Sequence, residues 1–178
     1  LFEVVATQTT TGYAMSNYVL WTPVLWLMLC ALMFFGACSG STSGAMKCVR
    51  VSILFKLMVN EFKRIVHPNA VIPVRITGKI VPSGVQSAIL AYTVIYIFVL
   101  ITGLFVNMAF GLDFLNAFGL SVSSVGNVGP ALGSFGPMDS FASLPDVLKW
   151  FSAFQMLIGR LEFFAVLLLF TPVFWRRQ

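Results

Sequence analysis

Residues Thr9-Thr10-Thr11-Gly12-Tyr13 place three hydroxyl side chains, a glycine and an aromatic ring inside otherwise apolar sequence. Glycine accepts φ angles that a Cβ disfavours, so an extended run ending in glycine can turn successive backbone carbonyls toward one axis. Such carbonyls can replace the hydration shell of a potassium ion. We therefore interpret this stretch as one strand of a cation-selectivity filter, although threonine–glycine turns also occur commonly in soluble proteins.

The composition places this chain in a membrane. Hydrophobic residues make up 58% of the sequence and charged residues only 10%, and the mean hydropathy is +0.92. Such values lie far outside the range of soluble domains. The apolar segments are separated by short connectors, so we expect all 178 residues to form one multi-pass membrane unit. The chain begins at Leu1 without an initiator methionine, and we expect it to be the C-terminal fragment of a longer protein.

The positive charges predict the orientation in the membrane. Of the eleven Lys and Arg residues, seven lie between Lys47 and Lys79, and Arg176 and Arg177 close the chain. Cytoplasmic loops carry an excess of Lys and Arg, so both regions, including the C-terminus, should be cytoplasmic. Residues 111–145 contain no Lys or Arg and should lie outside. The net charge of +5 therefore requires no nucleic-acid partner, although a basic inner face would also suit acidic lipids or a cytosolic regulatory subunit.

Residues 20–35 predict a helix that reaches only ~24 Å, short of a ~30 Å hydrocarbon core. In residues 36–44, which follow, seven of nine are Gly, Ser or Thr. Glycines at four-residue spacing can let a neighbouring helix pack closely. We favour unwinding at membrane depth, a placement that suits a gate, because small hydroxyl side chains compete for backbone hydrogen bonds. The candidate gate residues in this segment are Gly36, Gly40, Ser41, Thr42 and Gly44.

Residues 47–67 resume a helical pattern, with apolar residues at three- and four-residue spacing and cationic residues on the other faces. His67-Pro68 ends this amphipathic helix, since the residue before proline avoids the α region. Alternation over residues 71–81 predicts a small cytoplasmic hairpin. The three cysteines, at positions 30, 38 and 48, have no metal-ligand spacing and are expected to be reduced packing residues.

The uncharged run of residues 80–112 contains the next predicted span, over residues 85–110, which should cross from inside to outside. Asp113 is expected to cap a short helix over residues 114–124, which reaches only ~16 Å. The glycine-rich residues 125–133 follow. A half-length helix followed by such a strand favours re-entry into the membrane from outside, the alternative being an outer amphipathic helix with a turn.

Residues 148–175 predict the last span, which contains Arg160 and Glu162. Residues two apart on a helix do not face one another, so these two charges should not simply pair. Arg160 would lie near the bilayer centre, where a charge costs roughly 2.5–3.5 kcal/mol on an insertion scale and must face protein or water. We therefore expect Arg160 to have a functional role.

An internal repeat is visible across the chain. Thr11-Gly12 and Val128-Gly129 each follow a short predicted helix and precede a predicted span. The unit is a span, a re-entrant pore helix, a filter strand and a second span, so the predicted fold class is an all-α membrane protein with a potassium-channel-like arrangement. The chain carries about one and a half such units, and a closed ring of carbonyls needs more strands than these two.

Five motifs occur in the order found in one family of ion-transport proteins. They are TTTGY (9–13), GACSGSTSGAMK (36–47), HPNAV (67–71), NVGP (127–130) and GRLE (159–162). On these motifs the chain resembles the TrkH branch of the Trk/Ktr potassium-uptake family over essentially its whole length. The GRLE string points to Trk rather than Ktr.

The resemblance implies an architecture larger than this chain. The family has four repeats in one chain around a single pore, so residues 1–79 would be the end of the third repeat and residues 80–178 the fourth. A location in the bacterial cytoplasmic (inner) membrane, a homodimer and a cytosolic nucleotide-binding regulatory subunit of the TrkA type are also implied. The implied function is gated potassium translocation without covalent chemistry, so neither an enzyme nor a cofactor is expected and potassium is the substrate.

The resemblance also assigns roles to individual residues. The implied filter residues are Thr10, Thr11, Gly12 and Tyr13 in the third strand and Asn127, Val128, Gly129 and Pro130 in the fourth. Potassium would be held by the backbone carbonyls of Thr10, Thr11, Gly12, Asn127 and Val128. Residues 36–47 would form a gating loop beneath the filter, and Arg160 would be the cation that contacts it.

Five positions depart from the family pattern. Ala37, Ser43 and Ala45 stand where the family more often has glycine, Tyr13 replaces the more usual Phe, and Ala131 replaces a glycine. We expect a stiffer loop as a result. Two alternatives stay open: a sodium-permeable or ion-coupled relative, because one glycine per strand makes a less demanding filter, and a non-conducting membrane scaffold.

Overall fold

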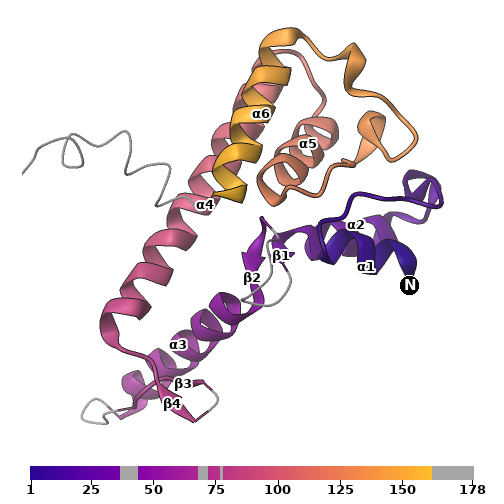
Figure 1. The fold of residues 1–178 in the computed structure, drawn as a ribbon. Coiled ribbons are helices and arrows are strands. Elements are labelled where there is room, and N and C mark those ends of the chain that lie inside the picture. The colour runs from indigo at the N-terminus through magenta and orange to yellow at the C-terminus, as the bar shows by residue number, and fades with distance from the viewer. Residues whose placement is uncertain (37–43, 68–71, 77, 162–178) are drawn as a thin grey trace, which may run out of the picture.

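The computed structural model describes residues 1–36, 44–67, 72–76 and 78–161. The helices are α1 (Phe2–Gln8), α2 (Pro23–Phe34), α3 (Cys48–Val66), α4 (Ser83–Ala109), α5 (Phe114–Gly126) and α6 (Asp146–Arg160). The short 3₁₀ turns are η1 (Tyr18–Leu20), η2 (Gly133–Phe135) and η3 (Phe141–Ser143), and the strands are β1 (Phe35–Gly36), β2 (Met46–Lys47), β3 (Arg75–Ile76) and β4 (Lys79–Ile80). The described chain is predominantly helical, as the sequence predicts (Figure 1).

Helix α4 is the longest element. It runs from the part of the structure that contains α3 and the strands β3 and β4 to the part that contains α5 and α6 (Figure 1). Its 27 residues include no charge, and at about 1.5 Å per residue they can cross a hydrocarbon core. Within the described residues it is the one helix that is both long and apolar enough to do so, while α2 and α5 are shorter apolar helices. The helix predicted over residues 85–110 is therefore confirmed, and it covers residues 83–109.

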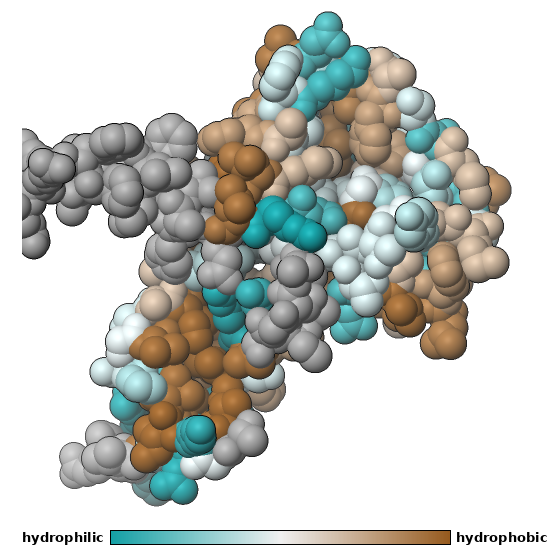
Figure 2. Space-filling view, viewed as in Figure 1, coloured by the Kyte–Doolittle hydropathy of each residue, from teal (hydrophilic) through white to brown (hydrophobic). Residues whose placement is uncertain are grey.

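Large apolar side chains are exposed along α4, as expected for a surface that contacts lipid or other protein. Along α4, Val94, Phe98 and Phe105 are largely exposed. Figure 2 shows hydrophobic side chains gathered over the lower part of the visible face, where α3 and α4 lie. Exposed aliphatic and aromatic side chains in this number would be unfavourable in water.

Helix α5 is enclosed by its neighbours. It packs against α4, α6 and α2, and from Ala117 to Gly126 its residues are buried except for Phe118. This burial favours the re-entrant interpretation over an outer amphipathic helix. The helix ends two residues beyond the predicted 114–124. Asp113 is its N-cap residue, as predicted, but the side chain makes no cap hydrogen bond, and the backbone carbonyl of Asp113 accepts from Ala117 N.

Helix α2 begins later than the sequence predicts. Residues 18–20 form the turn η1, Trp21 is extended, and Pro23 opens the helix. Proline suits the first helical turn because its fixed φ matches the helix and no N–H is needed there. The prediction of one helix over residues 20–35 overlooked this start signal.

The chain leaves the helical conformation after α2, as the glycine- and serine-rich segment predicts. Strand β1 is extended from Phe35 and pairs in parallel with β2, Gly36 lying opposite Lys47. Cys48 Sγ donates to the carbonyl of Gly36 at 2.9 Å. The described ends of the segment therefore favour unwinding over continuous helix packing. Of the predicted gate residues, Gly40, Ser41 and Thr42 lie outside the described residues.

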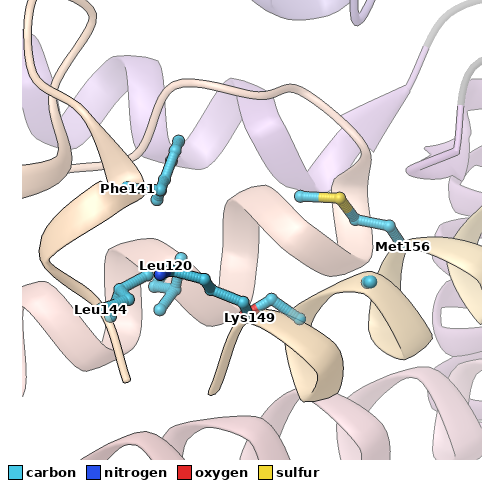
Figure 3. A pocket seen from close by; sticks show the side chains of 7 residues that line it. Leu120, Phe141, Leu144, Lys149 and Met156 are labelled. Atoms are coloured by element: carbon cyan, nitrogen blue, oxygen red, sulfur yellow. The ribbon is translucent and has the colours of Figure 1, made fainter. Parts of the chain in front are cut away.

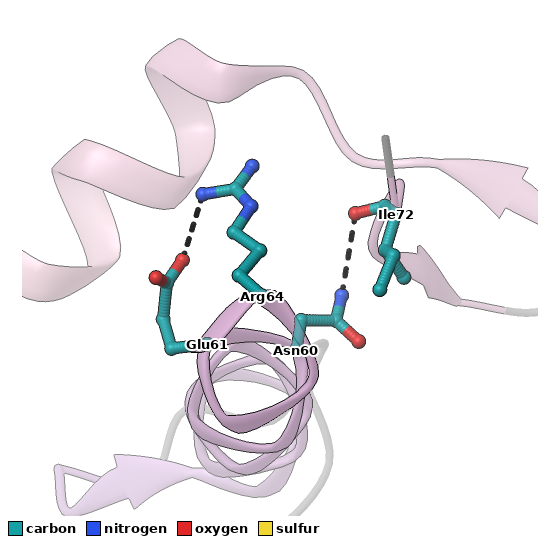
Figure 4. A network of polar contacts seen from close by, with 4 residues as sticks. All are labelled: Asn60, Glu61, Arg64 and Ile72. Carbon is teal, nitrogen blue, oxygen red and sulfur yellow. Dashed lines mark hydrogen bonds and ion pairs between the residues drawn. The ribbon is translucent and has the colours of Figure 1, made fainter. Parts of the chain in front are cut away.

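Helix α3 extends toward the region that the sequence predicts to be cytoplasmic and is tied to the hairpin β3–β4 (Figure 1). Lys56 Nζ donates to the carbonyl of Arg75 at 2.7 Å. Asn60 points toward the carbonyl of Ile72, and Arg64 pairs with Glu61 at 2.8 Å (Figure 4). The predicted hairpin is confirmed, although Thr77 in its turn lies outside the described residues.

An aromatic chain joins α3 to the membrane helices. The Arg50 guanidinium lies 4.0 Å from the ring centre of Tyr92 on α4, a cation–π distance. Tyr92 stacks on Tyr96 at 6.4 Å, and Tyr96 meets Phe34 edge-on at 6.5 Å. Phe34 is the last residue of α2, so the helices on both sides of the break are held to α4.

Helix α6 covers the first part of the predicted last span. It ends at Arg160, and Leu161 follows as the capping residue. Arg160 is the last residue of α6, and its side chain is exposed in the described structure. Residues 162–175 of the predicted span lie outside the described residues. A cation in the last turn is favoured by the helix dipole. Glu162 lies outside the described residues.

Close packing of α4 against α5 and α6 depends on Gly103. A Cβ at this position would overlap Gln155 of α6 and Ser121 of α5. We expect Gly103→Ala to lower the free energy of unfolding by about 1–3 kcal/mol, the usual cost of overpacking. The measurement is the melting temperature, in detergent, of the full-length protein that carries this segment.

The matched control is Gly84→Ala. Gly84 lies in the first turn of α4, and a Cβ at this position would meet nothing within 4 Å. This variant should have the melting temperature of the parent protein. An equal fall in melting temperature in the two variants would contradict the packing role of Gly103.

Candidate functional site

The two candidate filter strands begin with the same backbone turn. Thr10 has φ 54° after α1, and Asn127 has φ 56° after α5. Thr10 N donates to Thr7 O at 3.2 Å, and Thr11 N donates to Ala6 O at 3.0 Å. This pair of bonds around a left-handed residue is the Schellman motif that commonly ends helices.

The turn after α5 has the same two hydrogen bonds. Asn127 N donates to Ser124 O at 3.2 Å, and Val128 N donates to Ser123 O at 3.1 Å. Thr10 therefore corresponds to Asn127 and Thr11 to Val128. The internal repeat inferred from sequence has a structural counterpart in the way each short helix ends.

Each strand then turns at a glycine two residues later. Gly12 has φ 76° and Gly129 has φ 108°. Both values lie where side chains other than glycine are strained. Ser123 Oγ donates to the carbonyl of Gly129 at 2.9 Å, so that oxygen is directed back toward the pore helix. The carbonyl of Gly129 is not among those predicted to hold the ion, which are the carbonyls of residues 10–12 and 127–128.

The two strands meet at these glycines. A Cβ on Gly12 would lie 2.6 Å from the carbonyl oxygen of Val128, closer than real contacts allow. A Cβ on Gly129 would lie 3.7 Å from Cα of Gly12. Residues far apart in the sequence thus come into direct contact, and the predicted filter residues of both repeats form one cluster.

A side chain of each pore helix holds the strand that returns outward. Glu3, buried in α1, accepts from the backbone N of Met15 at 2.8 Å and of Ser16 at 3.2 Å. Asn116 of α5 accepts from the backbone N of Ser134 at 2.8 Å. Polar residues on apolar helices were the available signal in the sequence, but their partners lie twelve or more residues away and no local pattern predicts them.

A hydrogen bond also joins the segments that follow the two strands. The buried Tyr18 hydroxyl donates to the carbonyl of Ala131 at 3.1 Å. No sequence pattern singles out this role for Tyr18. The ends of α5 and α2 meet separately, near Asn127, since a Cβ on Gly126 would lie 3.1 Å from the carbonyl of Met33 in α2.

The two strands differ in how far they are covered. Val128 is 4% exposed, and its neighbours Asn127, Gly129 and Pro130 are partly buried. In the third strand, Thr11 and Tyr13 are exposed, and Thr10 and Gly12 are partly buried. The third strand therefore has an open side within the described structure.

Of the predicted gate residues, Gly44 lies close to the start of the fourth filter strand, at Asn127. Gly36 and Gly44 are buried, and a Cβ on Gly44 would lie 2.9 Å from the side chain of Asn127. Gly159 of α6 is also buried beside Asn127. Arg160 follows Gly159 directly, but its exposed side chain is not placed against the filter residues by any described contact.

The cavity drawn in Figure 3 is not lined by the filter residues, although one of its lining residues, Met156, accepts a hydrogen bond from Asn127. It has a volume of about 210 Å³ and is lined mainly by apolar side chains from α5, η3 and α6, among them Leu120, Phe141 and Met156. Lys149 at its edge pairs with Asp146 at 3.0 Å. No predicted site residue lines it.

A pair of pore-type helices, each ending in a left-handed turn and followed by a glycine-tipped strand, is the arrangement of a membrane transport protein. The family model for TrkH, a cation transport protein, matches residues 1–177. The chain therefore belongs to the TrkH family, and its place in a membrane follows from that membership.

Individual relatives agree with this assignment. The chain is 39% identical over 175 residues to the Trk system potassium uptake protein TrkH of Salmonella typhimurium, covering 98% of this chain and 36% of the relative. It is 38% identical over 178 residues to TrkI of Halomonas elongata, covering 99% and 36%. The crystal structure of the potassium transporter TrkH from Vibrio parahaemolyticus is similar with a TM-score of 0.89 and 36% identity, over 99% of this chain and 37% of that one. The chain thus spans about a third of the length of these relatives.

The hydrogen bond between Tyr18 and Ala131 can be tested by removing one atom. We expect Tyr18→Phe to lower the free energy of unfolding by about 1 kcal/mol or more, because a buried carbonyl loses its partner. The melting temperature of the full-length protein in detergent measures this. Tyr13→Phe is the matched control, since Tyr13 is exposed; a loss no larger than in this control would contradict the bond's contribution.

Proposed function

We propose that this chain forms two of the four filter strands of a Trk-type protein that translocates potassium through a gated pore. The observation that carries the proposal is the meeting of two strands with the same turn and the same glycine position, Gly12 against Val128. The names of the relatives, which are potassium uptake proteins, support potassium as the ion.

Ion coordination is assigned to backbone oxygens. The proposed ligands are the carbonyls of Thr10, Thr11, Gly12, Asn127 and Val128. Backbone carbonyls can replace the water shell of a monovalent cation. The open side of the third strand is where strands from the first two repeats would complete the ring, with residues 1–79 ending the third repeat and residues 80–178 forming the fourth.

The gate is assigned to the break after α2. Gly36 and Gly44 border it, and Gly40, Ser41, Thr42 and Arg160 are assigned to it by resemblance to the family. The burial of Gly44 beside Asn127 supports a position at the inner end of the filter. Arg160 would hold the segment closed and raise an electrostatic barrier to cations, because a fixed positive charge in a narrow pore repels them.

The surroundings of the protein complete the proposal. The cationic residues of α3 and the hairpin support a cytoplasmic position for that end of the molecule, and the C-terminus is assigned to the same side. The membrane is the bacterial cytoplasmic membrane, and its lipids contact the exposed face of α4. A homodimer and a cytosolic nucleotide-binding regulator of the TrkA type are the proposed partners.

Rubidium uptake tests the pore directly. In cells that lack other potassium importers, the full-length protein should take up rubidium, and Gly12→Ser or Gly129→Ser should abolish uptake. Gly12→Ser places a Cβ against the carbonyl of Val128, and both variants force a side chain into a positive φ. Gly84→Ser, at a position with open space, is the matched control and should retain uptake.

The alternatives give different results in this assay. No uptake by the parent protein would support a non-conducting scaffold. Uptake of sodium as efficient as that of rubidium would support a sodium-permeable relative. Full uptake by both filter variants would contradict the placement of the filter.

A second test addresses the gate. We expect Arg160→Ala to increase rubidium flux about tenfold, because removing a charge from the pore lowers the barrier to cations by roughly 1.4 kcal/mol. Initial uptake rates, normalised to the amount of protein in the membrane, measure the change. Arg64→Ala, which removes an exposed cation paired with Glu61, is the control. Unchanged flux in Arg160→Ala would count against the assigned role.

A further inference from the structure

Asn127 is the one candidate filter residue whose side chain has a described hydrogen bond to a different helix. Its Nδ2 donates to the carbonyl of Met156 in α6 at 2.8 Å. The backbone of Asn127 meanwhile makes the left-handed turn that starts the fourth strand, with φ 56°. One residue therefore belongs to the filter by its backbone and to α6 by its side chain.

The backbone turn alone does not explain asparagine at this position. Asparagine tolerates the left-handed region better than most residues, but glycine is the more usual choice after a helix end. A glycine would make the same turn without a side chain. The presence of an amide directed at Met156 therefore indicates that the side chain contributes something the turn does not require.

Two glycines make room for this amide. A Cβ on Gly159 would lie 2.9 Å from Nδ2 of Asn127, and a Cβ on Gly44 would lie 2.9 Å from both Cβ and Nδ2. Gly159 belongs to α6, and Gly44 precedes strand β2. The asparagine side chain is thus enclosed between α6 and the segment that leads into α3. Any residue other than glycine at position 44 or 159 would have to move this side chain.

We propose that Asn127 is a positioning residue that fixes the fourth filter strand to α6 and thereby sets how well the filter distinguishes potassium from sodium. The inference rests on the proposed function, because the proposed function makes the carbonyl of Asn127 an ion ligand. Discrimination between the two ions depends on the number and placement of ligand oxygens. A site held loosely by an ångström loses its specificity. The amide bond to Met156 restrains the peptide that carries one of these oxygens.

The test removes the amide and keeps the turn. Asn127→Gly retains the left-handed conformation and loses the bond to Met156. In the full-length protein we expect rubidium uptake to persist, with an apparent KM for potassium raised roughly fivefold and discrimination against sodium reduced by a similar factor, the effect of one hydrogen bond. The two readouts are competition of rubidium uptake by potassium and by sodium.

A second variant approaches the amide from the other side. Gly44→Ala would push against the Asn127 side chain and should reduce discrimination as well. In the Asn127→Gly background the obstructing Cβ and Nδ2 are absent, and only the carbonyl oxygen of Gly126, at 3.1 Å from the added Cβ, remains close. Gly44→Ala should therefore reduce discrimination less in this background than in the parent protein. This non-additivity distinguishes a contact between the two residues from two independent effects on folding. Gly84→Ala in both backgrounds is the control.

Each outcome decides the proposal. Lower discrimination in Asn127→Gly, with Gly44→Ala reducing it less there than in the parent, supports the positioning role. Discrimination and KM equal to those of the parent, or strictly additive effects, would overturn it. If Asn127→Gly fails to reach the membrane, Asn127→Asp, which keeps the shape and loses the donor, takes its place with the same criteria. Absence of uptake in the parent would refute the proposed function itself, so the two failures are separable.

Discussion

The close approach of Gly12 to the carbonyl oxygen of Val128 is the constraint on which the rest of the arrangement depends. Two strands can come this near only if the residue at the contact has no side chain and both helices end at matching positions. The Schellman turns at Thr10 and Asn127 provide that match. The buried pore helix α5, the anchors Glu3 and Asn116, and the bond from Tyr18 all act to hold these turns in place.

The class of the protein and the order of its elements could be predicted from the sequence because both depend on local signals. Hydropathy identified α4, small residues identified the break after α2, and glycines marked both strands. The same local reasoning missed the start of α2 at Pro23, although proline at the first helical position was a local signal for it.

The contacts that organise the site could not be predicted in this way. Tyr18 with Ala131, Asn127 with Met156 and Gly103 with Gln155 join residues that are far apart in the sequence. Each is a polar or small residue in apolar surroundings, which signals that a partner exists but not which one. Which neighbour a residue is buried against depends on how the helices pack. The sequence pattern indicates only that such a residue needs a partner.

The pairing of Gly12 with Val128 also has a consequence for biosynthesis. A ribosome makes the third strand long before the fourth, so the first turn emerges while its counterpart has yet to be translated. Contacts between such distant residues form late, because a long loop must close first. The contact between Gly12 and Val128 can therefore form only after α5 has been synthesised, and a chain whose synthesis stops before that helix would contain the first strand without its counterpart.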